Sequence, residues 1–260
     1  MRRREEALAA AEALAAAEAA AARSAQEQAD QGNTHEEHAH ALHRSVSVKS
    51  AVLTGSMRTL KNGQDAYVCN ELVGAKYLNV PCGVAVDTPS DVHGSHIVIA
   101  DSAKHKIHVF MNDGLHVRSF GVRGSGEGEL LQPYAIAVDA GGKILVTDLG
   151  NNRVQIFDIS GEFLRSFGSA GTGESQFVKP TGIALDTEGN VVVVDNGNNR
   201  LQVFSPDGVF IRSIGEPGDG DGQLSDPRGV AVNLKTGHIV VADFQNDRCQ
   251  IFSKEVEFCL

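Results

Sequence analysis

Residues 180–204 read PTGIALDTEGNVVVVDNGNNRLQVF, and four similar copies of this stretch occur along the 260-residue chain. The aspartates that close its central apolar run, Asp148, Asp195 and Asp243, are 47 and 48 residues apart. The phenylalanines that end it recur with the same spacing at Phe110, Phe157, Phe204 and Phe252. A repeat of this length indicates an array or a propeller. Residues that recur in every copy are therefore expected to be architectural, and residues that vary at a fixed position are where a partner can be recognised.

Each copy predicts four strands. A short run of small apolar residues after the proline, as in Gly182-Ile-Ala-Leu, is typical of a buried strand, and its central alanine suits a crowded place where strands converge. The second run, Val191–Val194, is apolar on both faces and predicts a strand covered on both sides. The third run alternates and predicts an outward-facing glutamine, which is Gln155, Gln202 or Gln250 in successive copies. The fourth run, Val209–Ile214, is the most polar, as an outer edge strand should be.

Four strands, with small residues in the innermost strand and polar residues in the outermost one, make a propeller blade. The chain contains no Trp, which disfavours a WD-type array. The pattern Pro-x-Gly-Ile-Ala-x-Asp, then a strand ending in Asp, then Asn-x-Arg-x-Gln-x-Phe closely resembles the NHL repeat over about residues 52–253. The resemblance implies an all-β, NHL-type propeller, which has six blades in well-known members of the family.

The chain is too short for six such blades. It supplies four clear four-stranded blades and a degenerate half-copy at Gly55–Leu60, which faintly matches Gly161–Phe167. The ring is thus expected to be open, completed by another chain, or truncated. Because natural proteins protect exposed edge strands, the alternatives are cover by the N-terminal extension, self-association, or a partial gene product.

Three regions are predicted: an extension over residues 1–45, a transition with the half-blade over 46–80, and the blades over 81–260. The Ala-rich start predicts a helix, but its only large apolar residues, Leu8 and Leu14, form a poor coiled-coil seam. Four histidines follow and are interpreted as surface residues rather than a zinc site: His35, His38, His40 and His43.

The composition of the chain argues against several classes of function. A formal charge of −10 argues against binding to nucleic acid or to an anionic membrane through a broad basic surface. No apolar run is long enough to span a membrane, and Glu5, Glu6 and Glu12 interrupt what would otherwise resemble a signal peptide. We therefore predict an intracellular, cytoplasmic protein. The four cysteines, interpreted as isolated thiols, are Cys69, Cys82, Cys249 and Cys259.

Several motifs are assigned to the scaffold. The Gly-rich stretches before each proline are followed by no helix, so they are interpreted as turns between blades rather than phosphate loops. Asp219-Gly-Asp-Gly has no closing Glu for a calcium loop. The recurring pairs are predicted to brace a turn by charge-assisted hydrogen bonds, and they are Asp148 with Arg153, Asp195 with Arg200, and Asp243 with Arg248. No catalytic residue, metal site or cofactor is predicted.

Positions that vary in register are the candidates for binding a partner. One set follows the proline, at the expected mouth of the innermost strands: Cys82, Tyr134, Thr181 and Arg228. The other follows the aspartate of the second strand: Ser102, Leu149, Asn196 and Phe244. Aromatic and arginine side chains such as Tyr134 and Arg228 concentrate binding energy at interfaces.

The function predicted is a non-catalytic scaffold or substrate-recognition module with a protein partner. The resemblance to NHL propellers also implies two alternatives, an adaptor in ubiquitin-ligase pathways and an RNA-binding propeller. The cysteine-rich RING of the tripartite-motif ligases has no counterpart before Pro81, and the acidic charge disfavours RNA. A propeller lyase or lactonase is the least favoured, because the four mouth residues are not a plausible set of metal ligands.

Overall fold

The computed structural model describes residues 73–87 and 96–253. The chain divides into two compact units, residues 1–48 and 49–260, and every described residue belongs to the second. The Ala-rich helix, the histidine tract and the half-copy at Gly55–Leu60 lie outside the described residues, as does most of the transition segment. Within the described ranges no helix is both long enough and apolar enough to cross a membrane.

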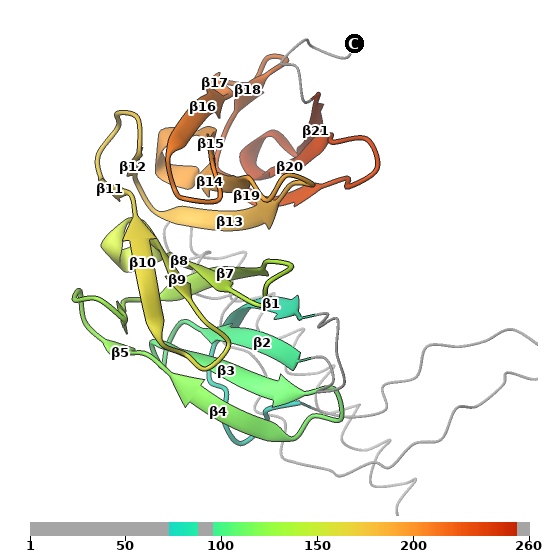
Figure 1. Ribbon diagram of the computed structural model, residues 1–260. Helices are drawn as coiled ribbons and strands as arrows, with labels where there is room; N and C mark the ends of the chain where they lie inside the picture. The colour runs from blue at the N-terminus through green and yellow to red at the C-terminus, as the bar shows by residue number, and fades with distance from the viewer. Residues whose placement is uncertain (1–72, 88–95, 254–260) are drawn as a thin grey trace, which may run out of the picture. The chain divides into compact units, whose positions relative to one another are not determined.

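The described residues form four antiparallel sheets, each a meander of successive strands (Figure 1). Blade 1 contains β1 (Pro81–Val86), β2 (His96–Asp101), β3 (Lys106–Met111) and β4 (His116–Phe120). Blade 2 contains β7 (Pro133–Val138), β8 (Ile144–Asp148), β9 (Arg153–Phe157) and β10 (Phe163–Phe167). Blade 3 contains β13 (Pro180–Leu185), β14 (Val191–Asp195), β15 (Arg200–Phe204) and β16 (Phe210–Ile214). Blade 4 contains β19 (Pro227–Val232), β20 (Ile239–Asp243) and β21 (Arg248–Phe252).

The all-β propeller blades predicted from the repeats are therefore confirmed. Blade 4 differs from the others, because it has three strands within the described residues where its sequence copy predicted four. The chain that follows β21 lies outside the described range after residue 253. In the part of the chain that is described, β21 is thus an edge strand.

The loops between blades have a common structure. Each contains a short parallel pair of strands: β5 (Val122–Arg123) with β6 (Glu129–Leu130), β11 (Ser169–Ala170) with β12 (Gln176–Phe177), and β17 (Glu216–Pro217) with β18 (Gln223–Leu224). One turn of 3-10 helix follows the second strand of blades 2, 3 and 4, at η1 (Leu149–Asn151), η2 (Asn196–Asn198) and η3 (Phe244–Asn246). The glycine-rich stretches thus connect blades, and in the described residues each leads into a strand.

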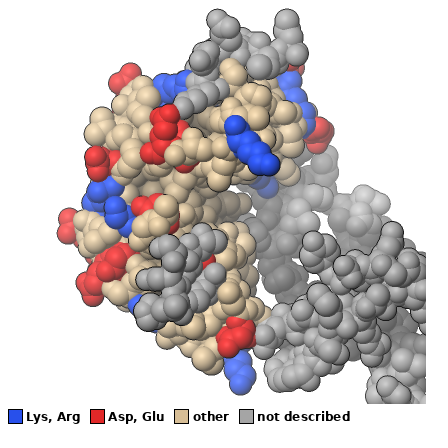
Figure 2. Space-filling view, turned by 45° about the vertical axis from the view of Figure 1, so that its right-hand side comes forward, with Lys and Arg blue, Asp and Glu red and all other residues tan. Residues whose placement is uncertain are grey.

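Charged side chains of both signs are distributed over the surface. On the face shown in Figure 2, the basic side chains form small separate groups among acidic ones. This view contains no continuous basic surface of the kind that binds a nucleic acid backbone.

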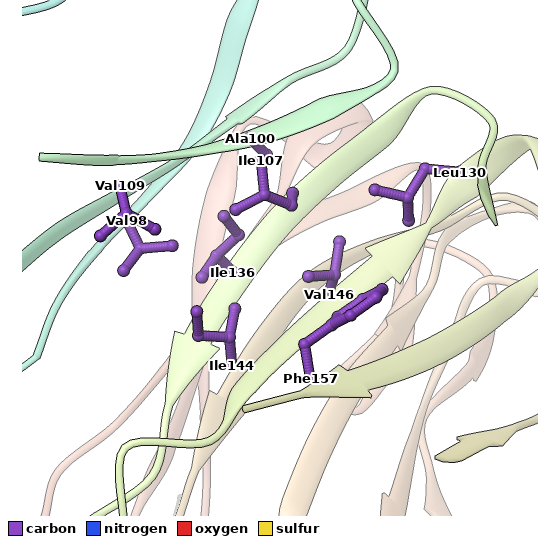
Figure 3. Packing of buried hydrophobic residues seen from close by; sticks show 9 residues of the cluster. All are labelled: Val98, Ala100, Ile107, Val109, Leu130, Ile136, Ile144, Val146 and Phe157. Carbon is purple, nitrogen blue, oxygen red and sulfur yellow. The ribbon is translucent and has the colours of Figure 1, made fainter. Parts of the chain in front are cut away.

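The apolar cores lie between successive blades. In the first, four residues on one face of blade 1 meet four on the facing side of blade 2, with Leu130 of the loop filling the gap (Figure 3). We call the side of a blade that faces the previous blade its leading face, and the opposite side its trailing face. The trailing face of blade 1 is Val98, Ala100, Ile107 and Val109, and the leading face of blade 2 is Ile136, Ile144, Val146 and Phe157. Equivalent residues form the cores between blades 2 and 3 and between blades 3 and 4.

The glutamine of the third strand is buried, contrary to the outward orientation that strand alternation predicted. Gln155 and Gln202 are both fully inaccessible to solvent. The Gln202 amide nitrogen donates to the carboxylate of Asp195 at 3.1 Å and to the carbonyl of Gln176 at 2.6 Å. Its oxygen accepts a hydrogen bond from the backbone N–H of Ser175 at 3.0 Å. A satisfied amide can be buried without a large desolvation cost, which is why the alternation rule fails here.

Each such glutamine belongs to a hydrogen-bonded group centred on the aspartate that ends the second strand. Asp195 is completely buried. One carboxylate oxygen accepts from the backbone N–H of Val178 at 2.8 Å. The other accepts from Asn198 at 2.9 Å, Arg200 at 2.9 Å and Gln202 at 3.1 Å. The carboxylate thereby fixes both the 3-10 turn and the loop that enters the blade.

Asp148 and Asp243 have the same partners in blades 2 and 4, including Arg153 and Arg248, each at 2.9 Å. Blade 1 differs, because Lys104, Lys106 and His108 stand where the other copies have Asn, Arg and Gln. Asp101 there accepts from the backbone N–H groups of Asn79 at 2.6 Å and Lys104 at 3.0 Å.

The hydrogen bonds around Asp243 predict a loss of stability in acid. Burial opposes ionisation of this carboxyl group, but hydrogen bonds from Ser225, Asn246, Arg248 and Gln250 outweigh it and lower its pKa. A carboxyl group with a lowered pKa stabilises the fold above its unfolded pKa of about 3.9 and loses that contribution as the pH falls further. We expect the free energy of unfolding in urea to decline below about pH 4.

The Asp243→Asn variant should be less stable than the wild type at pH 7 and should lose less stability between pH 5 and pH 3. The matched control is Asp221→Asn, in an exposed loop, which should follow the wild-type curve. An Asp243→Asn curve parallel to wild type would contradict this assignment.

Candidate functional site

The innermost strands bring the first set of candidate residues into one region. Successive inner strands β1, β7, β13 and β19 contact one another. The approach is close enough that an ideal Cβ on Gly83 would lie 2.6 Å from the Tyr134 carbonyl oxygen. On Gly182 it would lie 2.7 Å from the carbonyl oxygen of Arg228. Gly83 and Gly182 therefore allow neighbouring blades to pack backbone against backbone.

The phenol of Tyr134 is influenced by charged and titratable groups from two other blades. Burial raises the pKa of its phenol, and the nearby Cys82 of blade 1 raises it further, while Arg228 of blade 4 lowers it. Asp226, in the loop before blade 4, also raises it. Two other mouth residues, one in blade 1 and one in blade 4, thus act electrostatically on Tyr134. The phenol is neutral at physiological pH and can both donate and accept a hydrogen bond.

Arg228 is held in a compact group with Phe244. The guanidinium carbon lies 3.5 Å from the centroid of the Phe244 ring, a cation–π arrangement. One guanidinium nitrogen is 2.7 Å from a carboxylate oxygen of Asp226. Asn196 donates to the other oxygen of that carboxylate and, at 2.9 Å, to the carbonyl of Pro227. Half of the Phe244 side chain remains exposed, so the group presents an aromatic surface and a positioned cation to solvent.

The two candidates in blade 1, Cys82 and Ser102, interact with each other. The pKa of the Cys82 thiol is raised chiefly by burial, which outweighs a hydrogen bond with Ser102 that lowers it, and Asp101 raises it further. The Ser102 backbone N–H donates to the carbonyl of Val80 at 2.9 Å. At neutral pH Cys82 is therefore a protonated thiol and a poor nucleophile.

Thr181 is buried in the inner strand β13, whereas Leu149 lies in the turn after β8. Thr181 is 5% exposed, and its hydroxyl oxygen has no hydrogen-bond partner among the described residues. Its carbonyl accepts a 2.8 Å bond from Thr147 of the preceding blade. Leu149 starts the turn η1, which contacts β7, and it is half-buried. The structure thus places Cys82 and Arg228 within electrostatic range of Tyr134. It joins Phe244 to Arg228 directly and Asn196 to Arg228 through Asp226.

Sequence reasoning missed Asp226. It lies just before the proline, at the position held by Val80, Gln132 and Lys179 in the other copies. That variation in register was a signal that could have identified it.

Sequence reasoning also missed a polar cluster in blade 1. His108 stands where the other copies have Gln, and its Nδ1 is 2.7 Å from the Ser119 hydroxyl. The same hydroxyl is 2.8 Å from His116 Nε2, and Tyr77 stacks on the His116 ring. Burial lowers the pKa of His108, so its ring is neutral at pH 7. Its Nε2 is 3.9 Å from Asp101, beyond hydrogen-bonding distance, so these groups form no continuous acid–base relay in this structure.

No group of three or more potential metal-ligating side chains occurs within residues 73–87 and 96–253.

Comparison with solved structures supports the fold. The chain is similar to a streptogramin B lyase (TM-score 0.52, 16% identity, 68% of this chain and 52% of that one). It is also similar to virginiamycin B lyase from Staphylococcus aureus (0.51, 17%, 67% and 53%) and to a gluconolactonase from Xanthomonas campestris (0.52, 18%, 68% and 60%). The chain spans little more than half the length of these proteins. At such identities the likeness shows the fold alone, and a search of curated proteins finds no match.

Repeated four-stranded blades with an Asp-centred hydrogen-bond group define a β-propeller assembled from one repeated unit. Residues 130–157, 177–204 and 224–252 match the family model described as NHL repeat. The chain therefore contains NHL repeats, as the sequence resemblance implied. The three matched segments are those with the complete Asp, Asn, Arg and Gln set, which the blade 1 copy lacks.

Proposed function

We propose that this NHL-repeat chain is a non-catalytic interaction module that binds a protein partner at the mouth of its inner strands. The observation that carries the proposal is the Arg228–Phe244 pair, held in place by Asp226 beside the phenol of Tyr134. These side chains vary between copies, so the repeated architecture does not require them. Binding a partner gives them a role.

The chemistry of the site suits a peptide segment. Phe244 offers an exposed ring, and Arg228 keeps donors available beyond those directed at Asp226. The Thr181 hydroxyl, buried without a partner among the described residues, can pair with a polar group that enters the mouth. An aromatic anchor beside an oriented arginine is the arrangement that dominates binding energy at protein interfaces.

A protein partner is favoured over RNA on charge. The net charge is −10, and basic side chains on the face in Figure 2 lie among acidic ones. A role as an adaptor in ubiquitin-ligase pathways would use the same surface and rests on the family resemblance. The lyase and lactonase activities named above belong to those proteins, and the protonated thiol of Cys82 and the incomplete relay at His108 do not favour them here.

The test is selection of peptides from a random display library on the purified chain. Peptides that bind wild type should bind the Arg228→Ala/Phe244→Ala double variant at least about tenfold more weakly, because two hot-spot side chains are removed. The control is Leu164→Ala/Ile211→Ala, which shortens two exposed side chains on the outer strands β10 and β16. Equal loss in both double variants, or equal binding to all three proteins, would contradict the site. Preferential retention of RNA in a salt titration would favour the RNA-binding alternative.

A further inference from the structure

Arg228 has one free edge on its guanidinium group. The edge formed by Nε and Nη2 is bound to a single carboxylate oxygen of Asp226, at 3.2 and 2.7 Å. Nη1 has no hydrogen-bond partner among the described residues. The side chain of Arg228 is 42% exposed. The edge formed by Nη1 and Nη2 is therefore available to a ligand, and it carries two parallel N–H donors.

Neighbouring side chains fix the orientation of this edge. The Phe244 ring lies against one face of the guanidinium, whose central carbon is 3.5 Å from the ring centroid. Asp226 holds the Nε edge, and its other carboxylate oxygen accepts from the Asn196 amide. That amide also donates to the carbonyl of Pro227 at 2.9 Å. An arginine that is already oriented loses little rotamer freedom on binding, so the free edge is preorganised for a planar ligand.

Two hydroxyl groups in the same region also lack acceptors. Thr181 lies on β13, which contacts both β7, the strand of Tyr134, and β19, the strand of Arg228. The Thr181 hydroxyl is buried and has no hydrogen-bond partner within the described ranges. The phenol of Tyr134 donates to no described residue, and burial keeps it protonated by raising its pKa. A guanidinium, a phenol and an aliphatic hydroxyl group thus all have donors to offer.

The charged acceptor of the mouth is already occupied. Both carboxylate oxygens of Asp226 accept hydrogen bonds, one from Asn196 and the other from Arg228. Cys82 is a protonated thiol at neutral pH and so provides no second anion. A ligand that pairs with the free donors must therefore bring acceptor oxygens of its own.

A carboxylate is the acceptor that fits best. Its two oxygens lie in one plane and pair with a guanidinium edge through two parallel hydrogen bonds, which are about twice as strong as bonds between neutral groups. A phosphate group could pair in the same way, but it carries nearly two charges. Because Asp226 is bound to the same guanidinium, its repulsion of a ligand grows with the ligand's charge and favours the carboxylate.

We propose that the peptide segment bound at the mouth is acidic, and that one of its carboxylates pairs with the Nη1–Nη2 edge of Arg228. This inference rests on the proposed function of the mouth and names the chemistry of the segment that binds there. An Asp or Glu side chain and the C-terminus of a partner present the same group. The half-exposed ring of Phe244 provides an apolar contact for the residue beside that carboxylate.

The experiment measures, by fluorescence anisotropy, the affinity of the full 260-residue chain for peptides selected from the random library. Each peptide is made in four forms, with Asp and Glu kept or replaced by Asn and Gln, and with a free or an amidated C-terminus. The form without any carboxylate should bind about tenfold more weakly or worse, because a charge-assisted pair is lost. The single carboxylate that restores the affinity identifies its source as a side chain or as the C-terminus.

Two protein variants locate the effect. Arg228→Gln removes the guanidinium edge and should bind all four forms with the same low affinity. The matched control is Arg123→Gln, which removes an equal charge at an exposed position of β5 and should discriminate between the forms as wild type does. Both variants should keep the wild-type circular dichroism spectrum.

The outcomes separate this inference from the function on which it rests. Peptides that bind wild type equally well in all four forms would overturn the carboxylate contact and leave peptide binding in place. An acid requirement that Arg228→Gln retains, or a phosphoserine form that binds more tightly than the Asp form, would also overturn it. A library that yields no binding peptide would remove the proposed function and this inference together.

Discussion

Asp195→Ala is expected to lower the free energy of unfolding by roughly 3–5 kcal/mol, the cost of removing one partner from a buried ion pair. The carboxylate is fully buried and accepts four hydrogen bonds. Its loss leaves the Arg200 guanidinium, the Asn198 amide and the Val178 N–H short of an acceptor. For a domain of this size the melting temperature should fall by roughly 10 °C.

The measurement is a thermal melt followed by circular dichroism, with urea unfolding for the free energy. The matched control is Asp207→Ala, which removes a carboxylate that is 84% exposed and 3.7 Å from Arg165. An exposed ion pair of this kind contributes at most about 1 kcal/mol, so the control should melt close to wild type. Unchanged melting of Asp195→Ala together with lost peptide binding would show that Asp195 belongs to the binding site instead.

Gly182→Ala is expected to destabilise the fold by about 2–3 kcal/mol, the range for overpacking a close-packed interior. An ideal Cβ there would lie 2.7 Å from the carbonyl oxygen of Arg228 and 3.1 Å from the amide nitrogen of Val230. Both atoms belong to the backbone of β19, so blades 3 and 4 must separate to admit one methyl group. Because Arg228 lies at that contact, we also expect the affinity for a selected peptide to fall.

Urea unfolding at pH 7 measures this effect, with Gly141→Ala as the control. Gly141 lies in an exposed turn, where the nearest atom to an added Cβ is a side-chain oxygen of Asp139 at 3.3 Å. The control should therefore remain within about 0.5 kcal/mol of wild type. If Gly182→Ala were as stable as the control, the close backbone approach between β13 and β19 would be wrong.

The repeat explains why so much of the fold could be predicted. Each blade buries the same apolar positions, so the four copies report one pattern of strands and turns four times. The Asp and Arg of each pair are close in sequence, and their 2.9 Å contacts in blades 2, 3 and 4 depend on a single local turn. Gln155 and Gln202 were misplaced because alternation describes which side of a strand a residue occupies, whereas their burial follows from hydrogen bonds to a loop some 26 residues away.

The candidate site could be predicted only in part. Variation in register selected Tyr134, Arg228 and Phe244 without showing which of them touch. It passed over Asp226, whose carboxylate orients Arg228.

The sequence by itself determined the repeat length, the strands of each blade and the residues that differ between copies, because these depend on local propensity and periodic burial. Only the tertiary structure decided that Cys82 and Arg228 act on the phenol of Tyr134, and that the second-strand aspartates bind the entering loops. Those facts depend on how blades pack against one another. A blade sequence records which of its faces are apolar, and the packed structure shows which of those faces already has a neighbour.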